Sequence, residues 1–287
     1  MDNNSNYFNL ILNSSNVVSN SNNTTFQYNF KGGAFAVKDG AQICVSSITM
    51  PYSFFNVNQT LYNNSTFTYR WYSNSSTYVT YTVTLPNGFY QASDINNYLQ
   101  QYMISQNQYL INSSTGAYQY FISILTNTTY YSNQILTFQV PATLPSGYTA
   151  PSGFVFSGYV PTVQILNNNF GALLGFTAGS YPTNTQATSY SALSNTVPNA
   201  TPVNSIIVTS NIVNNPVTIP SNVLDSFTFS NTSFGSNIVY EPKFSKFINL
   251  SKGHYINFIL NLVDQNFNPI VANDPNILIN LIIKEPK

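Results

Sequence analysis

The chain has 287 residues, a formal net charge of zero and 43% hydrophobic residues, but only 6% of its residues are charged. Folded domains usually carry about 25% charged residues. Disordered chains combine low hydrophobicity with high net charge, so this composition excludes disorder. No run of Lys or Arg forms a basic patch, which argues against specific binding of nucleic acid.

The charged residues are also unevenly spread, since none occurs between Asp94 and Asp225. A surface without charges offers few ion pairs and lacks the repulsion that keeps most proteins apart. The pattern therefore favours a protein that associates permanently with other chains. Codon bias in an AT-rich genome would also enrich Lys, which is scarce here, so it does not explain the composition alone.

The first residues, Met1 to Ser5, lack the basic segment and apolar core of a secretory signal. No stretch approaches about 18 apolar residues, so no membrane span is expected. Cys44 is the single cysteine, which excludes an internal disulfide. It lies in the apolar run Ile43-Cys44-Val45 and is expected to be a buried, unreactive thiol in a strand.

The next predicted elements alternate with a period of two, which is typical of half-buried strands. Their apolar faces are Phe67, Tyr69 and Trp71 in the first strand, then Val79, Tyr81, Val83 and Leu85 in the second. Pro86-Asn87-Gly88 then marks a turn. Aromatic and β-branched residues of this kind are enriched in sheets.

A helix is predicted over 94–105, with Ser93 as its N-cap and Asp94 in its first turn. Its apolar residues follow helical spacing and are Ile95, Tyr98, Leu99, Tyr102 and Met103. The stripe should seal one side of a β-sandwich.

Further strands follow the helix, and each is predicted to have one apolar face. These faces are Leu136, Phe138 and Val140, then Ile256, Phe258, Leu260 and Leu262, and finally Ile277, Ile279, Leu281 and Ile283. Residues 141–205 are rich in Pro, Gly, Ser, Thr and Asn, which predicts long loops or a small inserted β lobe. Many short strands separated by turns indicate an all-β sandwich or jelly roll.

The segment from Phe170 to Phe176 is a compact apolar run containing Gly171 and Gly175. One interpretation is a loop tucked against the edge of the core. The other is a contact between subunits, made by Leu173, Leu174 and Phe176.

Catalytic and metal-binding patterns are missing from the sequence. The eight acidic residues are dispersed, His254 is the only histidine, and no Gly-x-Ser-x-Gly motif occurs. One histidine and one cysteine are too few for a usual metal site. We therefore expect no enzyme, no metal and no cofactor. A hydrolase with a site assembled in space would have to use His254.

Several short segments resemble the penton proteins of virophages and of Polinton/Maverick-type elements. They are the run from Ile48 to Val57, the run from Leu85 to Tyr90 before the helix, the segment Leu173-Leu174-Gly175-Phe176, and the run that starts with Asn204-Ser205-Ile206-Ile207-Val208 and continues to the terminal strand. Together they extend over most of the chain, and each is short and mainly structural.

The sequence pattern predicts an all-β fold, a single jelly-roll β-sandwich over 1–287 with one short amphipathic helix and a possible inserted lobe or long loops over 106–205. The resemblance implies the same single jelly roll. It implies a homopentameric penton at the fivefold vertices of an icosahedral capsid. Its partners would be its own copies, a double jelly-roll major capsid protein and, as a further option, a host receptor or glycan. The protein would be located in the virion and assembled in the cytoplasm of the host cell.

Five residues are candidate assembly contacts: Leu173, Leu174, Phe176, Lys243 and Lys246. Lys243 and Lys246 belong to a loose cationic group that also contains Lys252 and His254. This group would contact another subunit or packaged genome, or form a solvated loop. The Asn- and Ser-rich residues 1–16 are a candidate tether to neighbouring subunits.

An alternative function is a carbohydrate- or receptor-binding module, such as a fibre or spike head. Exposed aromatic rings suit sugar recognition, and Trp71, Tyr72 and Tyr78 would be the candidates. The alternating pattern around Trp71 favours a place in the core instead.

Overall fold

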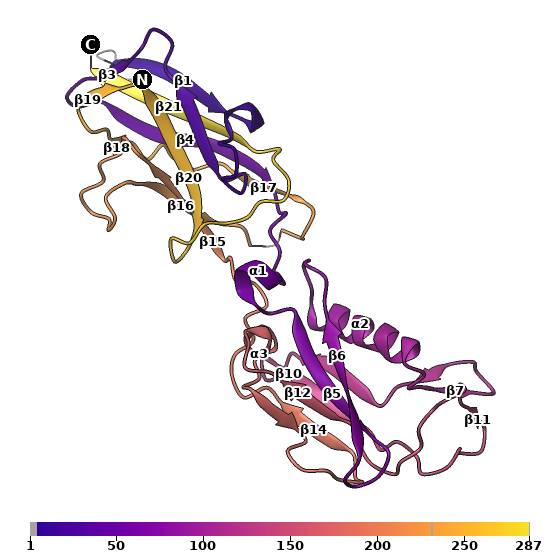
Figure 1. The fold of residues 1–287 in the computed structure, drawn as a ribbon. Coiled ribbons are helices and arrows are strands. Elements are labelled where there is room, and N and C mark those ends of the chain that lie inside the picture. The colour runs from indigo at the N-terminus through magenta and orange to yellow at the C-terminus, as the bar shows by residue number, and fades with distance from the viewer. Residues whose placement is uncertain (1–4, 231, 287) are drawn as a thin grey trace. The chain divides into compact units, whose positions relative to one another are not determined.

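The computed structural model describes residues 5–230 and 232–286 and consists mainly of antiparallel β-sheets (Figure 1). The chain forms two compact units. The first unit comprises 1–54 and 203–287, and the second comprises 55–202. The second unit is thus an insertion into the sequence of the first.

The first unit contains two main sheets. Across the first sheet lie β1 (Ser5–Leu12), β21 (Leu278–Pro286), β4 (Gln42–Pro51) and β17 (Asn237–Tyr240), with β18 (Ile248–Asn249) also paired to β4. Across the second lie β16 (Val223–Thr228), β15 (Ser205–Ser210), β20 (Asn257–Asp264) and β2 (Thr25–Asn29). A small third sheet pairs β3 (Phe35–Val37) with β19 (Gly253–Tyr255), and a 3-10 helix, η1, covers Ser14–Asn16.

The strand order of these two sheets is that of a jelly roll. In chain order the main strands are β1, β2, β4, β15, β16, β17, β20 and β21. The first sheet therefore contains the first, eighth, third and sixth of them, and the second sheet contains the second, seventh, fourth and fifth. All these pairings are antiparallel, as two Greek keys require. The predicted jelly-roll fold class is confirmed, and the second unit enters between the third and fourth strands.

The core of the jelly roll lies between the inner faces of the two sheets. Buried and partly exposed residues alternate along β20 and β21, with Phe258, Leu260 and Leu262 buried on one strand and Ile279, Leu281 and Ile283 on the other. This is the period expected where one face of each strand packs against a second sheet. The sequence pattern places Ile256 on the same face, but this residue precedes β20 and is exposed.

The second unit has three small sheets and three helices among its described residues. Its four-stranded sheet is β13 (Gly179–Tyr181), β12 (Thr162–Ile165), β5 (Thr66–Tyr72) and β6 (Tyr78–Thr84). Two three-stranded sheets are β14 (Tyr190–Leu193), β10 (Ser132–Thr137) and β9 (Ile122–Asn127), and β11 (Tyr148–Thr149), β7 (Leu110–Asn112) and β8 (Tyr118–Gln119). The helices are α1 (Gln59–Tyr62), α2 (Ala92–Ser105) and α3 (Phe170–Leu174).

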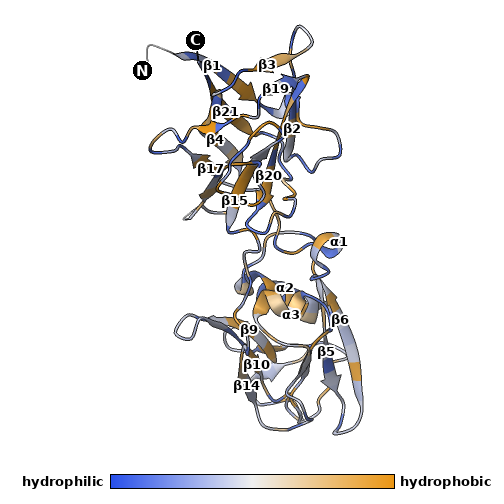
Figure 2. Cartoon of the chain, turned by 90° about the vertical axis from the view of Figure 1, so that its left-hand side faces the viewer, coloured by the Kyte–Doolittle hydropathy of each residue, from blue (hydrophilic) through white to orange (hydrophobic). Residues whose placement is uncertain are grey.

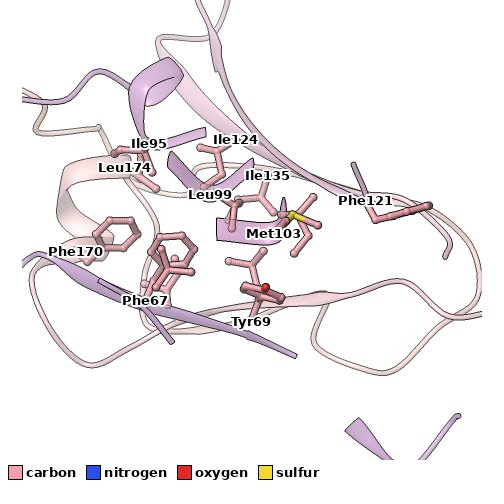
Figure 3. Packing of buried hydrophobic residues seen from close by; sticks show 14 of the residues in the cluster. Phe67, Tyr69, Ile95, Leu99, Met103, Phe121, Ile124, Ile135, Phe170 and Leu174 are labelled. Carbon is pink, nitrogen blue, oxygen red and sulfur yellow. The ribbon is translucent and has the colours of Figure 1, made fainter. Parts of the chain in front are cut away.

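Helix α2 confirms the predicted amphipathic helix but begins two residues earlier. The backbone N–H of Gln91 donates to Oδ2 of Asp94 at 2.8 Å, so Gln91 precedes the first turn and Ser93 lies inside the helix. Its buried residues include Ile95, Leu99 and Met103, which join the core of the second unit (Figure 3). The helix therefore covers strands of the second unit, and the expectation that it seals the jelly-roll sandwich is wrong.

Hydrophobic residues are concentrated where α2 and α3 contribute to the core of the second unit (Figure 2). Within the described part of the chain, no helix has the length and apolar character needed to cross a membrane.

The buried face of β10 is the opposite of the predicted one. Ile135 and Thr137 are fully buried, whereas Leu136 is only partly buried and Phe138 is exposed. Val140, which lies after the end of β10, is buried as predicted. Ile135 lies opposite Ile124 of β9, and both side chains belong to the core. Because this strand has an aliphatic residue on each face, alternation alone does not identify the inner one.

The inserted part also differs in extent from the segment 106–205 named from the sequence. The second unit starts at Phe55 and ends at Pro202, so β5, β6 and α2 belong to it. Strands in both units have the same period, and the sequence pattern therefore contains no mark of this boundary.

The N-terminal residues proposed as a tether are largely part of the jelly roll. Residues 5–12 form β1, which pairs with β21 along its whole length. Residues 1–4 lie outside the described residues. The hypothesis that residues 1–16 form a tether is therefore wrong for residues 5–12, because these residues pair with β21 of the same chain.

Candidate functional site

The segment from Phe170 to Phe176 is packed inside the second unit. Leu173, Leu174 and Phe176 are buried in its core, and the Phe170 ring stacks on Phe67 at 4.7 Å. This burial agrees with the interpretation of a segment tucked into the core. As contacts to another subunit, the three side chains stay a prediction.

Gly171 permits this close packing. A Cβ atom at this position would overlap the carbonyl oxygen of Phe176 and lie 2.8 Å from Cγ2 of Ile165. The backbone of α3 and the following turn approach each other at a distance that only glycine allows. Gly175 has a steric role as well, because its φ is +80° and an added Cβ would overlap the carbonyl oxygen of Thr196.

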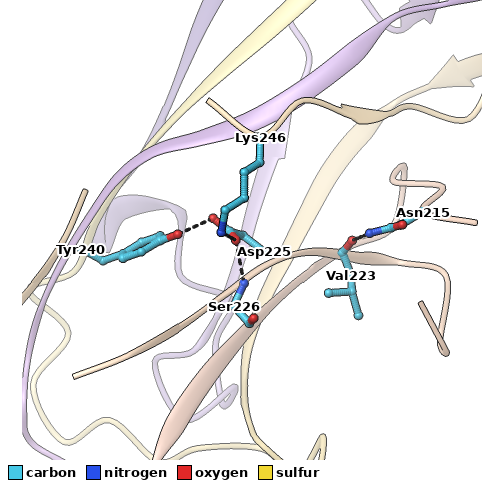
Figure 4. Close-up of polar contacts among 6 residues, drawn as sticks. All are labelled: Asn215, Val223, Asp225, Ser226, Tyr240 and Lys246. Carbon is cyan, nitrogen blue, oxygen red and sulfur yellow. Dashed lines mark hydrogen bonds and ion pairs between the residues drawn. The ribbon is translucent and has the colours of Figure 1, made fainter. Parts of the chain in front are cut away.

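Lys246 is held by a buried carboxylate of the same chain. Its Nζ lies 3.0 Å from Oδ1 of Asp225 on β16, and the Tyr240 hydroxyl donates to Oδ2 at 2.7 Å (Figure 4). The Ser226 backbone N–H donates to Oδ1 at 2.9 Å. The hydrogen bond to Asp225 raises the pKa of Lys246, and burial, followed by the Asp225 hydrogen bond, raises the pKa of Tyr240.

This network fastens the segment that follows β17 to the jelly roll. The Tyr240 ring also stacks on Phe227 of β16 at 4.4 Å. Ser245 contacts Cys44 through its side chain, while burial raises the pKa of the Cys44 thiol. Cys44 is buried, as predicted.

The other cationic residues of this region are exposed. Lys243, Lys252 and His254 all lie at the surface, and His254 is on β19 opposite Ala36 of β3. Within the described residues, the structure records no ion pair for Lys243. Of the two lysines named as assembly contacts, Lys246 is therefore engaged inside the chain and Lys243 is available at the surface.

A loop of the first unit displays two aliphatic side chains that sequence reasoning missed. Val217 is 88% exposed and Ile219 is 95% exposed. Hydrogen bonds from Asn215 close the loop that contains Val217 and Ile219. The Asn215 backbone N–H donates to the Ser221 carbonyl, and its Nδ2 donates to the Val223 carbonyl at 3.2 Å (Figure 4). The signal in the sequence is the placement of β-branched residues between two prolines, where a solvated turn normally has polar ones.

The outward side of β1 adds to the exposed apolar surface of the first unit. Tyr7 and Ile11 on this strand are exposed, and Ile11 lies between the inward residues Leu10 and Leu12. The Tyr7 ring lies edge-on to Phe247 at 6.5 Å. We call Tyr7, Ile11, Val217 and Ile219 the exposed apolar set.

The strands at the ends of the two jelly-roll sheets have almost no charged residues. β1, β2 and β17 contain none, and the only one in β16 is the buried Asp225. End strands usually carry Lys, Pro or other features that prevent pairing with another chain. Among the described residues, none of these end strands exposes a charged side chain that would prevent such pairing.

The aromatic residues named for sugar recognition lie mostly in the core. Trp71 is 3% exposed, Tyr72 is 4% exposed, and only Tyr78 is at the surface, with Arg70 lying over its ring. The Trp71 indole N–H donates to the Val155 carbonyl, and its ring contacts Phe121 and Phe154. The core interpretation of Trp71 is confirmed, and its proposed role with Tyr72 as an exposed platform is wrong.

Among the described residues, no three or more acidic, histidine or cysteine side chains gather as they would around a metal ion.

No protein-family model matches the sequence, and no curated protein matches it. Solved structures that are similar over nearly the whole chain include the following two. One is the mavirus penton protein, with 10% identity, a TM-score of 0.46, and 99% of each chain covered. The other is a chain of the cryo-EM structure of the Sputnik virophage, with 13% identity, a TM-score of 0.39, 100% of this chain and 99% of that chain covered.

Proposed function

We propose that the chain is a structural virion protein that forms a homopentameric penton at the fivefold vertices of an icosahedral capsid. The observation that carries the proposal is the jelly roll of the first unit, whose end strands expose no charged side chain. Jelly rolls of eight strands are a common architecture of viral capsid domains. The short segments that resemble virophage pentons lie in both units.

The surface chemistry supports a permanent assembly. Val217 and Ile219 are nearly fully exposed on a loop that is fixed by hydrogen bonds, so their burial would cost little ordering entropy. Burying apolar surface contributes about 25 cal/mol per Å². A ring closed by head-to-tail contacts would cover such side chains in every copy.

The remaining partners follow from the same proposal. A penton contacts the double jelly-roll major capsid protein around the vertex, resides in the virion, and is assembled in the host cytoplasm. A host receptor or glycan would be a further partner at the outer surface. The protein would work by assembly and not by catalysis.

Charge substitutions in the exposed apolar set test this proposal. Ile11→Lys and Ile219→Lys should each lower the assembled fraction, because a lysine buried in a contact without a partner loses its hydration. Sedimentation velocity measures that fraction, and circular dichroism checks that each variant is folded.

Val79→Lys is the matched control. Val79 is also an exposed β-branched residue, but it lies on β6 of the second unit. It should sediment like the wild type. If Ile11→Lys and Ile219→Lys also sediment like the wild type, the exposed apolar set of the first unit does not mediate assembly.

A further inference from the structure

The second unit contains a pocket of about 410 Å³ beside the start of α2. Its walls come from α2, from the β9–β10 hairpin, from α3 and from the segment around residue 200. Small-molecule sites usually have volumes of about 300–1,000 Å³. The pocket is therefore large enough for a ligand of modest size.

The walls are mainly apolar and carry no formal charge. Ile95 and Leu174 contribute aliphatic surface, and Tyr90 and Tyr131 contribute aromatic rings. No Asp, Glu, Lys, Arg or His lines the pocket in the described part of the chain. A charged ligand would lose its hydration here without gaining a counter-ion, so the pocket favours a neutral one.

Ser132 supplies a polar group that the protein itself leaves without a partner. This residue lines the pocket, is 7% exposed, and has a buried Oγ with no hydrogen-bond partner among the described residues. A buried hydroxyl without a partner costs free energy of folding. The neighbouring Asn133 differs, since its Nδ2 donates to the Leu174 carbonyl at 3.1 Å and its Oδ1 accepts from Thr126.

We propose that this pocket binds a neutral, mainly apolar small molecule with one hydrogen-bonding group, and that Ser132, whose Oγ is covered in the structure, rotates about its Cα–Cβ bond to pair with that group. The apolar walls bury the body of the ligand, and the serine fixes its orientation. The site lies entirely within the second unit and does not depend on the proposed role in a capsid.

N-phenyl-1-naphthylamine is a suitable probe, because it is neutral, largely apolar and has one N–H group. Its fluorescence rises in apolar surroundings, so titration of the intact protein measures binding directly. The wild type should show saturable binding of one probe per chain. Ser132→Ala should weaken binding about five- to tenfold through loss of one hydrogen bond.

A second variant blocks the pocket without altering the serine. Ala200 lines the pocket and its side chain is exposed, so Ala200→Trp should fill the space and abolish binding while the fold is kept. Thr137→Val is the control. Thr137 is on the same strand and also has a buried hydroxyl without a partner among the described residues, but it does not line the pocket. It should bind the probe like the wild type.

The charge preference gives an independent test. The anionic probe 8-anilinonaphthalene-1-sulfonate should bind at least about tenfold more weakly than the neutral probe. Failure of the wild type to bind N-phenyl-1-naphthylamine saturably would overturn the proposal. Equal binding by the wild type, Ser132→Ala and Ala200→Trp would overturn it as well.

Discussion

Asp225 illustrates how one buried carboxylate can organise a surface segment. It accepts from the Tyr240 hydroxyl, the Ser226 backbone and the Lys246 ammonium, and these contacts join residues at the end of β17 and beyond it to β16. A buried carboxylate needs such partners to offset its loss of hydration. The lysine in this network is thus a structural element of the first unit.

The two lysines named from the sequence should therefore differ in their effect on stability. Lys246→Met removes one charged hydrogen bond to Asp225 and, because water partly screens the half-exposed lysine, should lower the free energy of unfolding by about 1 kcal/mol. Lys243→Met is the matched control, since Lys243 is exposed, and it should change stability by less than about 0.5 kcal/mol. Urea titrations followed by circular dichroism measure both. Equal effects would mean that the network contributes nothing.

The stability difference between the wild type and Lys246→Met should depend on alkaline pH. The pKa of Lys246 is raised above its ordinary value of 10.5 by Asp225, so the folded state favours the protonated ammonium. The wild-type advantage is therefore complete below pH 10.5 and is lost as the pH rises through the folded-state pKa. Urea titrations across that range measure it. An advantage that stays constant to about pH 12 would contradict the assigned role of the ion pair.

At the scale of elements, α3 and its turn show how a short apolar segment becomes core. Phe170 stacks on Phe67, and Gly171 lets the following turn return close to the helix. Figure 3 shows Phe170 and Leu174 with the residues of α2 in one cluster. The segment thus belongs to one core with α2 and with β5, the strand that contains Phe67.

Gly171→Ala should consequently destabilise the second unit. The added methyl group overlaps a backbone oxygen that cannot move aside without shifting the turn, at a cost of about 1–3 kcal/mol. Gly179→Ala is the control, because a Cβ there meets only the Tyr181 ring at 3.9 Å. Fluorescence of Trp71, the only tryptophan, reports unfolding of this unit. Equal stability of the two variants would contradict the packing of α3 against its turn.

Local signals explain which elements can be predicted from the sequence. Helix α2 is predictable to within two residues because its apolar spacing and Asp94 are local features. The inner face of β10 is not, because Ile135 and Leu136 are equally apolar and only pairing with β9 distinguishes them. The partner of Lys246 is not predictable either, since Asp225 lies 21 residues away in the sequence.

At the scale of the whole molecule, the jelly roll is predictable but its interruption is not. The final strands have clear alternation, and their pairing produces the predicted sandwich. The boundary at Phe55 follows from contacts between distant segments, which a repeated strand pattern does not reveal. The exposure of Val217 and Ile219 likewise depends on how Asn215 holds their loop.

Assembly of the whole molecule should depend only weakly on salt. The second unit has Arg70 and Asp94 as its only charged residues, and the end strands of the jelly roll have almost none. Screening of ion pairs should therefore change little between about 50 mM and about 500 mM NaCl. Sedimentation velocity at both concentrations should give the same assembled fraction. Dissociation at the higher concentration would indicate contacts dominated by charge.

The mass of the purified protein in solution tests the penton proposal most directly. Light scattering behind a sizing column should give a mass about five times that of the 31.9 kDa chain. A trimer would contradict the proposal and indicate a spike or fibre head. A monomer that persists at high protein concentration would contradict the claim that these uncharged surfaces drive assembly.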